Sequence, residues 1–154
     1  MNKNIDYVPT DFEAERASNA YLMSLLAVMV GMPLPIINLI ASLIYFFSNR
    51  RSSYFVRWHC TQTLLSQVTL VVCNSIGFTY TLSIVLGTNK LSNNYIAYML
   101  TIILFNLTEF VITIRAAIRT RKGLHVEWLF WGEITNLICK PDIDKVNSFE
   151  YKTK

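Results

Sequence analysis

The sequence has few charged side chains, and three long stretches have none at all. Only 16% of the 154 residues are charged, against roughly 25% in soluble domains. No Asp, Glu, Lys or Arg occurs in residues 17–49, 60–89 or 91–108. Uncharged stretches of this length predict membrane segments, because a soluble globule interrupts its apolar surface with charges. The sequence therefore predicts an all-α membrane protein of a single domain.

Residue types that catalyse reactions or bind metals are also scarce. The three cysteines, Cys60, Cys73 and Cys139, show no C-x-x-C spacing, and there are only two histidines. Isolated cysteines in apolar segments are usually small buried hydrophobes, so neither a disulfide nor a metal site is expected. No Ser-His-Asp arrangement indicates nucleophilic catalysis. We therefore expect a protein that is not an enzyme and that needs no cofactor and no metal.

The net charge of +4 comes from basic residues that lie beside the apolar stretches. Arg50, Arg51 and Arg57 precede the second stretch, and four more basic residues occupy positions 115–122. Positive charge at the ends of membrane segments predicts cytoplasmic loops, so we place loop 50–59 and the C-terminus inside. Lys90 stands alone between the second and third stretches, which places that loop outside. The expected partner is the lipid bilayer, and no nucleic acid is expected.

Charge and hydropathy divide the chain into a polar N-terminal tail (1–16), a transmembrane bundle (17–122), an interfacial helix (123–140) and a mobile charged tail (141–154). Thr10 and Glu13 have the spacing of a capping box, which predicts a helix over about residues 11–31. The sequence Gly31-Met32-Pro33-Leu34-Pro35 then breaks the first segment, because proline removes a backbone donor. The broken segment is either one kinked crossing, with the N-terminus outside, or a re-entrant pair of half-helices, with the N-terminus inside. We slightly favour the re-entrant pair.

The stretch from Ser52 to Gly87 organises the rest of the chain. Its aromatic and basic start, residues 54–59, leads into thirty uncharged residues, 60–89, enough to cross a hydrocarbon core of roughly 30 Å. A further membrane helix is expected over about residues 94–119. Polar side chains recur at intervals of three and four along these helices and along residues 36–49, which places them on one face of each. Polar side chains are unfavourable in contact with lipid, so these faces should point into the bundle. The residues expected in the bundle interior are Asn38, Ser42, Ser66, Thr69, Asn74, Asn106, Glu109 and Thr113.

The residues expected at the lipid head groups are basic or are tryptophans. Leu124 to Cys139 reads as an interfacial amphipathic helix with apolar and polar sides. It is interpreted as a membrane anchor, with docking of a partner as the alternative. The full head-group set is Arg50, Arg51, Arg57, Trp58, Arg119, Arg121, Lys122, Trp128 and Trp131.

The segment Phe55-Val56-Arg57-Trp58-His59-Cys60-Thr61-Gln62 carries a family resemblance. It resembles the aromatic-Val-Arg-aromatic-His/Asn-x-x-Gln motif of small bacterial membrane proteins related to a chloroplast inner-envelope import component, Tic-twenty. Phe55, Arg57, His59 and Gln62 are the motif positions. The resemblance covers about residues 21–138 and implies a compact four-segment bundle in the bacterial inner (plasma) membrane, with the motif loop inside. It also implies a link to protein translocation.

Three functions compete at this level. The first is a non-enzymatic subunit or accessory of a larger membrane assembly, with translocation or insertion as the linked process and with protein partners or a homo-oligomer. The second is a small channel or carrier that uses Glu109 and the polar stripe of the central helix. The third is a lipid enzyme with Arg57 as a phosphate clamp, which the missing nucleophile disfavours. For Glu109 itself, structural pairing with Arg115, His59 or Gln62 competes with a proton, ion or substrate role.

Overall fold

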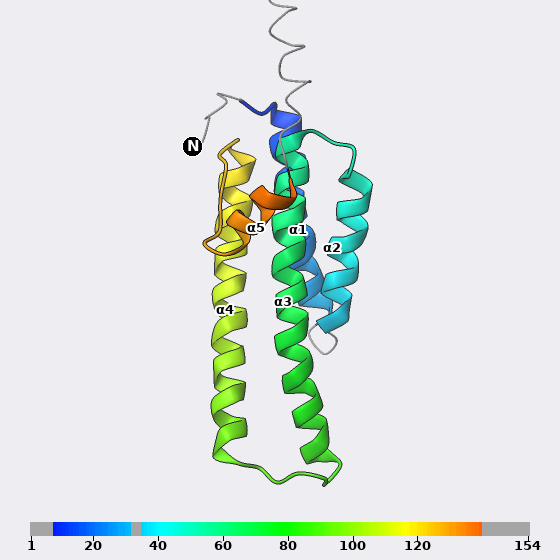
Figure 1. The fold of residues 1–154 in the computed structure, drawn as a ribbon, viewed down its shortest axis with the longest axis vertical. Coiled ribbons are helices and arrows are strands. Elements are labelled where there is room, and N and C mark those ends of the chain that lie inside the picture. The colour runs from blue at the N-terminus through cyan, green and yellow to red at the C-terminus, as the bar shows by residue number, and fades with distance from the viewer. Residues whose placement is uncertain (1–7, 32–34, 140–154) are drawn as a thin grey trace, which may run out of the picture.

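The computed structural model describes residues 8–31 and 35–139, and these residues form five helices (Figure 1). The helices are α1 (Asp11–Gly31), α2 (Pro35–Asn49), α3 (Tyr54–Val85), α4 (Asn93–Arg121) and α5 (Trp131–Ile138). The long helices α3 and α4 form a hairpin, and the shorter α1 and α2 lie beside its upper half (Figure 1). The prediction of an all-α fold is confirmed for the described residues.

Helices α3 and α4 are each long and apolar enough to cross a membrane. They have 32 and 29 residues, and each contains an apolar stretch of 18 residues with at most two charged side chains. Both begin and end within two residues of the predicted positions. Gly87, with φ of 73°, allows the chain to leave α3 in a left-handed conformation that favours glycine. The Ser92 hydroxyl then caps α4 by accepting the Tyr95 backbone N–H at 3.3 Å.

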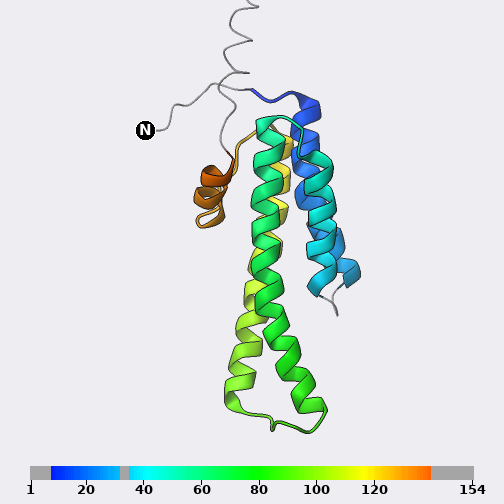
Figure 2. The same cartoon turned by 45° about the vertical axis from the view of Figure 1, so that its right-hand side comes forward.

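The first apolar segment is two helices and not one continuous crossing. Helix α1 ends at Gly31 and α2 begins at Pro35, a residue suited to the first helical position because its missing N–H would have no partner there. The two helices run in opposite directions side by side (Figures 1 and 2). The rest of the predicted break, residues 32–34, lies outside the described residues. The described residues therefore form two adjacent helices in place of one continuous helix.

Helix α1 packs against α2, α3 and α4 and lies at the centre of the upper bundle. Small residues allow this close approach: Ala17 and Ala20 contact the start of α3, around Phe55. On its other side α1 buries Tyr21 against α4. The Ser18 hydroxyl also donates to the Ala117 carbonyl of α4 at 2.9 Å. Small side chains and interhelical hydrogen bonds are what hold helices together in a bilayer, where the hydrophobic effect between helices is weak.

The start of α1 confirms the predicted capping box. The Thr10 backbone N–H donates to the Glu13 carboxylate at 2.9 Å, and the Glu13 N–H donates to the Thr10 hydroxyl at 3.3 Å. Each side chain therefore satisfies a backbone donor that the first turn leaves free.

The segment after α4 is only partly helical, and the predicted helix from Leu124 to Cys139 is wrong over its first half. Gly123, with φ of 74°, ends α4, and residues 124–128 are neither helix nor turn. Helix α5 has eight residues and lies beside α3 (Figure 1). The Val126 carbonyl and the Trp128 N–H bond to the Gln62 side chain of α3, and in a helix over residues 124–139 they would bond to the helix itself.

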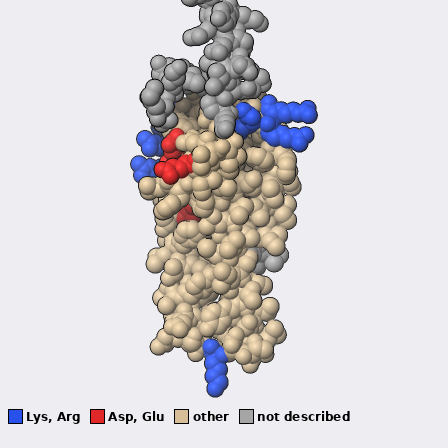
Figure 3. Space-filling view, in the orientation of Figure 1, with Lys and Arg blue, Asp and Glu red and all other residues tan. Residues whose placement is uncertain are grey.

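Charge lies at the two ends of the molecule, and the surface between them is largely uncharged (Figure 3). The end with the α2–α3 turn and the C-terminus of α4 carries the arginine-rich groups, and Lys90 lies in the loop at the other end. Along α3, Arg57 and Val85 are about 42 Å apart at 1.5 Å per residue. That separation matches a bilayer with its head groups, roughly 40–45 Å.

Candidate functional site

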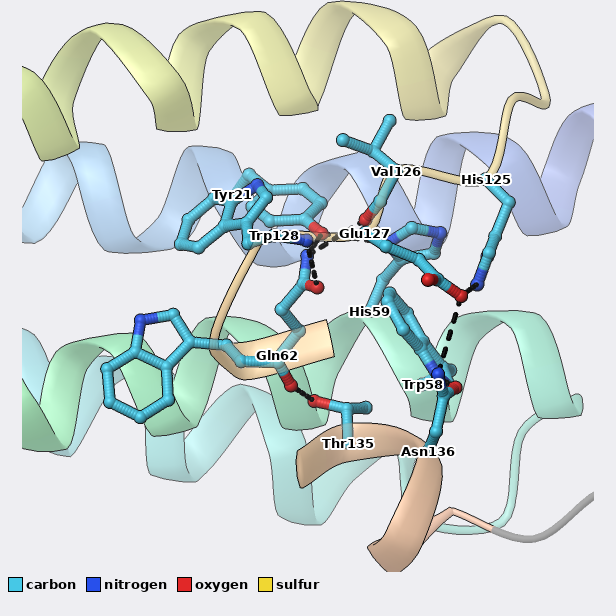
Figure 4. Close-up of polar contacts among 11 residues, drawn as sticks. Tyr21, Trp58, His59, Gln62, His125, Val126, Glu127, Trp128, Thr135 and Asn136 are labelled. Carbon is cyan, nitrogen blue, oxygen red and sulfur yellow. Dashed lines mark hydrogen bonds and ion pairs between the residues drawn. The ribbon is translucent and has the colours of Figure 1, made fainter. Parts of the chain in front are cut away.

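The side-chain amide of Gln62 is the centre of a buried polar cluster between α1, α3 and residues 124–128 (Figure 4). Its Nε2 donates to the Tyr21 hydroxyl at 2.8 Å and to the Val126 carbonyl at 3.0 Å. Its Oε1 accepts the Trp128 backbone N–H at 3.0 Å. One amide thus pairs with a C=O and an N–H two residues apart, as a neighbouring strand would. We call Tyr21, His59, Gln62 and residues 126–128 the clasp.

His59 is the second member of the clasp, and it is fully enclosed. Its Nδ1 lies 2.7 Å from the Tyr21 hydroxyl, and its side chain has no exposed surface. Because the Tyr21 oxygen accepts from Gln62, its own proton is free to be donated to Nδ1. The ring packs against Phe55 and Trp58, with centroids 4.6 and 5.0 Å away. Among the described residues, no hydrogen-bond partner reaches Nε2.

A rim of polar contacts joins α3 to α5 around the clasp. The Trp58 indole donates to Asn136 Oδ1 at 2.7 Å, and Asn136 donates to Glu127 at 3.5 Å. The same Glu127 carboxylate lies 3.4 Å from His125 Nε2. Burial lowers the pKa of His125 below its ordinary value, and Glu127 opposes that shift. The rim therefore ties residues 125–136 to the first turns of α3.

A second polar cluster, the membrane seam, joins α3 to α4 nearer the middle of both helices. Asn74 and Asn106 exchange hydrogen bonds at 3.0 and 2.8 Å. The Ser66 hydroxyl donates to the Glu109 carboxylate. Such interhelical bonds contribute roughly 0.6 kcal/mol on average and up to about 1.7 kcal/mol. Glu109 is bonded here to Ser66, and not to the Arg115, His59 or Gln62 that we considered as its partners.

The structure brings only some of the expected interior residues together. Ser66, Asn74, Asn106 and Glu109 meet across the seam. Thr69 turns its hydroxyl back to the Leu65 carbonyl of its own helix, at 3.2 Å. Thr113 is buried on α4, one turn before Ala117, whose carbonyl accepts from Ser18 of α1. The remaining two, Asn38 and Ser42, have buried oxygens without a hydrogen-bond partner in the described part of the chain.

Two tryptophans expected at the lipid head groups are inside the protein, and for them the expectation was wrong. Trp58 has no exposed surface, because its indole is held by Asn136. Trp128 packs on Tyr21 with ring centroids 5.7 Å apart. Trp131 is half-buried. The exposed members of the head-group set are Arg50, Arg51, Arg119, Arg121 and Lys122, with Arg57 half-buried.

Of the four motif residues, three face the clasp and one does not. Phe55, His59 and Gln62 lie together, whereas Arg57 lines a separate pocket beside α2. No sequence pattern pointed to Tyr21 or to the backbone at 126 and 128, because their role depends on contacts 38 to 66 residues away. Chemically, the clasp fixes one chain segment to two helices. It does not present its histidine to solvent.

Comparison with known proteins identifies the family. Residues 15–132 match the MamF/MmsF magnetosome magnetite crystal formation protein family. No match was found among curated proteins or among solved structures. The family match overturns the resemblance to proteins related to Tic-twenty, and with it the basis for a link to protein translocation. Because the match spans most of the chain, the protein belongs to the magnetosome magnetite crystal formation protein family, a family of membrane proteins.

Proposed function

We propose that this chain is a non-enzymatic, multi-pass membrane protein that serves as an accessory subunit of a larger assembly. Family membership suggests the setting, a membrane on which magnetite crystals form. The proposed role is to organise that membrane or its proteins, without turning over a substrate.

One observation carries the proposal: two of the motif residues that catalysis would require, His59 and Gln62, are enclosed by the protein and form internal hydrogen bonds. His59 and Gln62 have no exposed surface, and both the NH2 and the C=O of the Gln62 side-chain amide are bonded to other parts of the chain. A residue that acts on a substrate must be reachable by it. These side chains instead stabilise the fold, which favours a structural role for the motif.

The charge distribution supports a defined orientation. The arginines of residues 50–57 and the basic C-terminus of α4 would lie on the cytoplasmic side, and Lys90 on the other. Helices α1 and α2 would then enter from the cytoplasmic side as a re-entrant hairpin that leaves the N-terminus inside. The chain after Cys139, which we predicted to be cytoplasmic and mobile, lies outside the described residues.

The cytoplasmic end also offers an apolar surface for a protein partner or a second copy. Leu129, Phe130 and Leu137 are 91, 78 and 77% exposed on α5 and the turn before it. Large exposed apolar side chains at the head-group level fit either a protein interface or the bilayer edge.

Purification from its own membrane in mild detergent, followed by mass spectrometry, tests the proposal. Specific protein partners, or a stable homo-oligomer, should be recovered with the native chain and reduced with Phe130→Ser and Leu137→Ser. Leu86→Ser is the matched control, because Leu86 is 69% exposed at the opposite end. Reproducible recovery of the chain alone, as a monomer at full yield, would overturn the proposal.

A small channel or carrier is the second candidate, and the carboxyl group of Glu109 favours it. Ionisable groups in a membrane helix usually mark ion or proton paths, and within the described residues Glu109 has one hydrogen bond, from Ser66. Purified protein in liposomes would then conduct ions or protons, and Glu109→Gln would abolish the flux. Absence of flux, or flux unchanged by Glu109→Gln, removes this candidate.

A further inference from the structure

A pocket of about 390 Å³ opens at the arginine-rich end, on the side of the bundle where α2 ends and α3 begins. Its described lining contains two arginines, Arg50 and Arg57, and no acidic side chain. The pocket is lined by Phe46, Asn49, Arg50, Arg57, Thr61, Ile138 and Cys139.

The walls of this pocket are held by their own hydrogen bonds. Asn49 is only 2% exposed and donates to the Tyr45 carbonyl at 2.8 Å, which fixes the turn that carries Arg50. The Thr61 hydroxyl donates to the Arg57 carbonyl at 2.9 Å and lies 3.2 Å from Cys139 Sγ. The Thr61–Cys139 contact joins α3 to the end of α5, and the other two bonds lie within α2 and α3.

Arg57 has a buried donor that no described residue satisfies. Its Nε has no hydrogen-bond partner among them. The ion pairs formed within residues 8–31 and 35–139 are Arg121 with Glu15 and His125 with Glu127, so neither pocket arginine pairs with an acidic side chain of those residues. Buried donors are nearly always paired, and a guanidinium is shaped to bind the oxygens of a carboxylate or phosphate. A buried donor that the described residues leave unmet, in a pocket that opens to the surface, is suited to an anionic ligand.

The position of the pocket along the bundle indicates which anion lies near it. Arg57 lies at the end of α3 where the phosphates of a bilayer are expected, about 42 Å along the helix from Val85. Phe46 and Ile138 provide apolar walls beside the two arginines. An arginine pair next to apolar side chains matches a phosphate attached to a glycerol and acyl chain.

We propose that this pocket binds the phosphate group of an anionic phospholipid, with Arg50 and Arg57 as its ligands. The shared chemistry is a phosphate oxyanion, which a lipid head group or free phosphate could supply. The apolar walls favour the lipid, because they have no use in binding a fully hydrated ion. The site is separate from the clasp, and it does not depend on the accessory role proposed above.

Lipid titration of the full chain in neutral detergent, followed by native mass spectrometry, tests the site. We expect one phosphatidylglycerol to bind saturably and phosphatidylcholine to bind more weakly. Arg57→Gln and Arg50→Gln should each weaken phosphatidylglycerol binding by about tenfold, the loss expected for one charge-assisted contact. Lys90→Gln is the control, because Lys90 is an exposed basic residue at the opposite end of the molecule.

Several results would contradict the proposal. Equal binding of the two lipids, or unchanged binding after Arg50→Gln, would show that the pocket does not select an anionic head group. Full displacement of phosphatidylglycerol by millimolar inorganic phosphate would assign the site to a free anion and overturn the lipid. Arg50 is exposed, so Arg50→Gln tests the site even if Arg57→Gln prevents folding.

Discussion

Replacement of Gln62 by leucine should release residues 124–128 from α3. The substitution keeps the approximate volume of the side chain and removes its amide. The Val126 carbonyl and the Trp128 N–H would then lose their partner, at 3.0 Å each in the native chain. The Tyr21 hydroxyl keeps its hydrogen bond to His59. Most of the lost stability therefore comes from the two backbone groups.

The expected magnitude follows from those two groups. A buried polar group left without a partner costs roughly 1–3 kcal/mol, so Gln62→Leu should cost about 2–6 kcal/mol. Val126 is half-buried, so water that hydrogen-bonds to its carbonyl would bring the loss of stability toward the lower end of this range. The loss should be local, because α1, α3 and α4 retain their own contacts.

Amide hydrogen exchange in detergent or nanodiscs measures this directly. In the native chain the Trp128 amide should be strongly protected, and in Gln62→Leu its protection should fall by more than about tenfold. Gln67→Leu is the matched control: Gln67 is equally buried on α3, but its Oε1 has no partner among the described residues. Removal of that group should leave stability unchanged or higher. Equal effects of the two substitutions, or Trp128 protection untouched in Gln62→Leu, would refute the reasoning.

Three further outcomes are expected. Asn74→Leu, Asn106→Leu and the double variant, compared by thermal unfolding, should give a coupling free energy of roughly 0.6–1.7 kcal/mol between the two side chains. Additive effects of the two substitutions would show that the two amides are not hydrogen-bonded to each other. Tyr21→Phe should lower the free energy of unfolding by about 1–3 kcal/mol, because Gln62 and His59 lose their shared hydroxyl, and a neutral result in thermal unfolding would count against the clasp. With the native cysteines replaced, Ser52→Cys should react with a membrane-impermeant thiol reagent from the cytoplasmic side and Asn93→Cys from the opposite side. Labelling of both from one side would reject the proposed orientation.

The helices of this protein could be predicted from the sequence because their causes are local. Uncharged runs, a capping box and a Gly-Pro break determine where helices α1 to α4 begin and end, and each signal lies within a few residues of its effect. The polar faces could also be recognised from their spacing. Their pairing across the bundle could not, because periodicity does not say which helix a face meets.

The predictions that were wrong concern residues whose contacts lie far away in the sequence. Residues 124–128 have the apolar spacing of a helix, but their backbone bonds to Gln62 outweigh that preference. Trp58 and Trp128 look like interface residues by type, and both are buried by partners that lie 78 and more than 100 residues away. Single-sequence patterns contain no information on such partners.

The family comparison separates the motif from its first interpretation. Phe55, Arg57, His59 and Gln62 resemble a motif of relatives of an import component, whereas the matched family is named for magnetite crystal formation. The structure explains why the motif is informative about fold: its side chains hold α1, α3 and the segment after α4 together. A motif that builds a core specifies little about the process that the protein serves.

The central claim is that the Gln62 amide is bonded inside the chain, to Tyr21 and to the backbone of residues 126–128. Nuclear magnetic resonance of the protein in nanodiscs, with glutamine side chains labelled, tests it most directly. The account predicts slowly exchanging Gln62 amide protons with contacts to the Tyr21 ring and to Val126. Rapid exchange of those protons with water, without contacts to either residue, would contradict it.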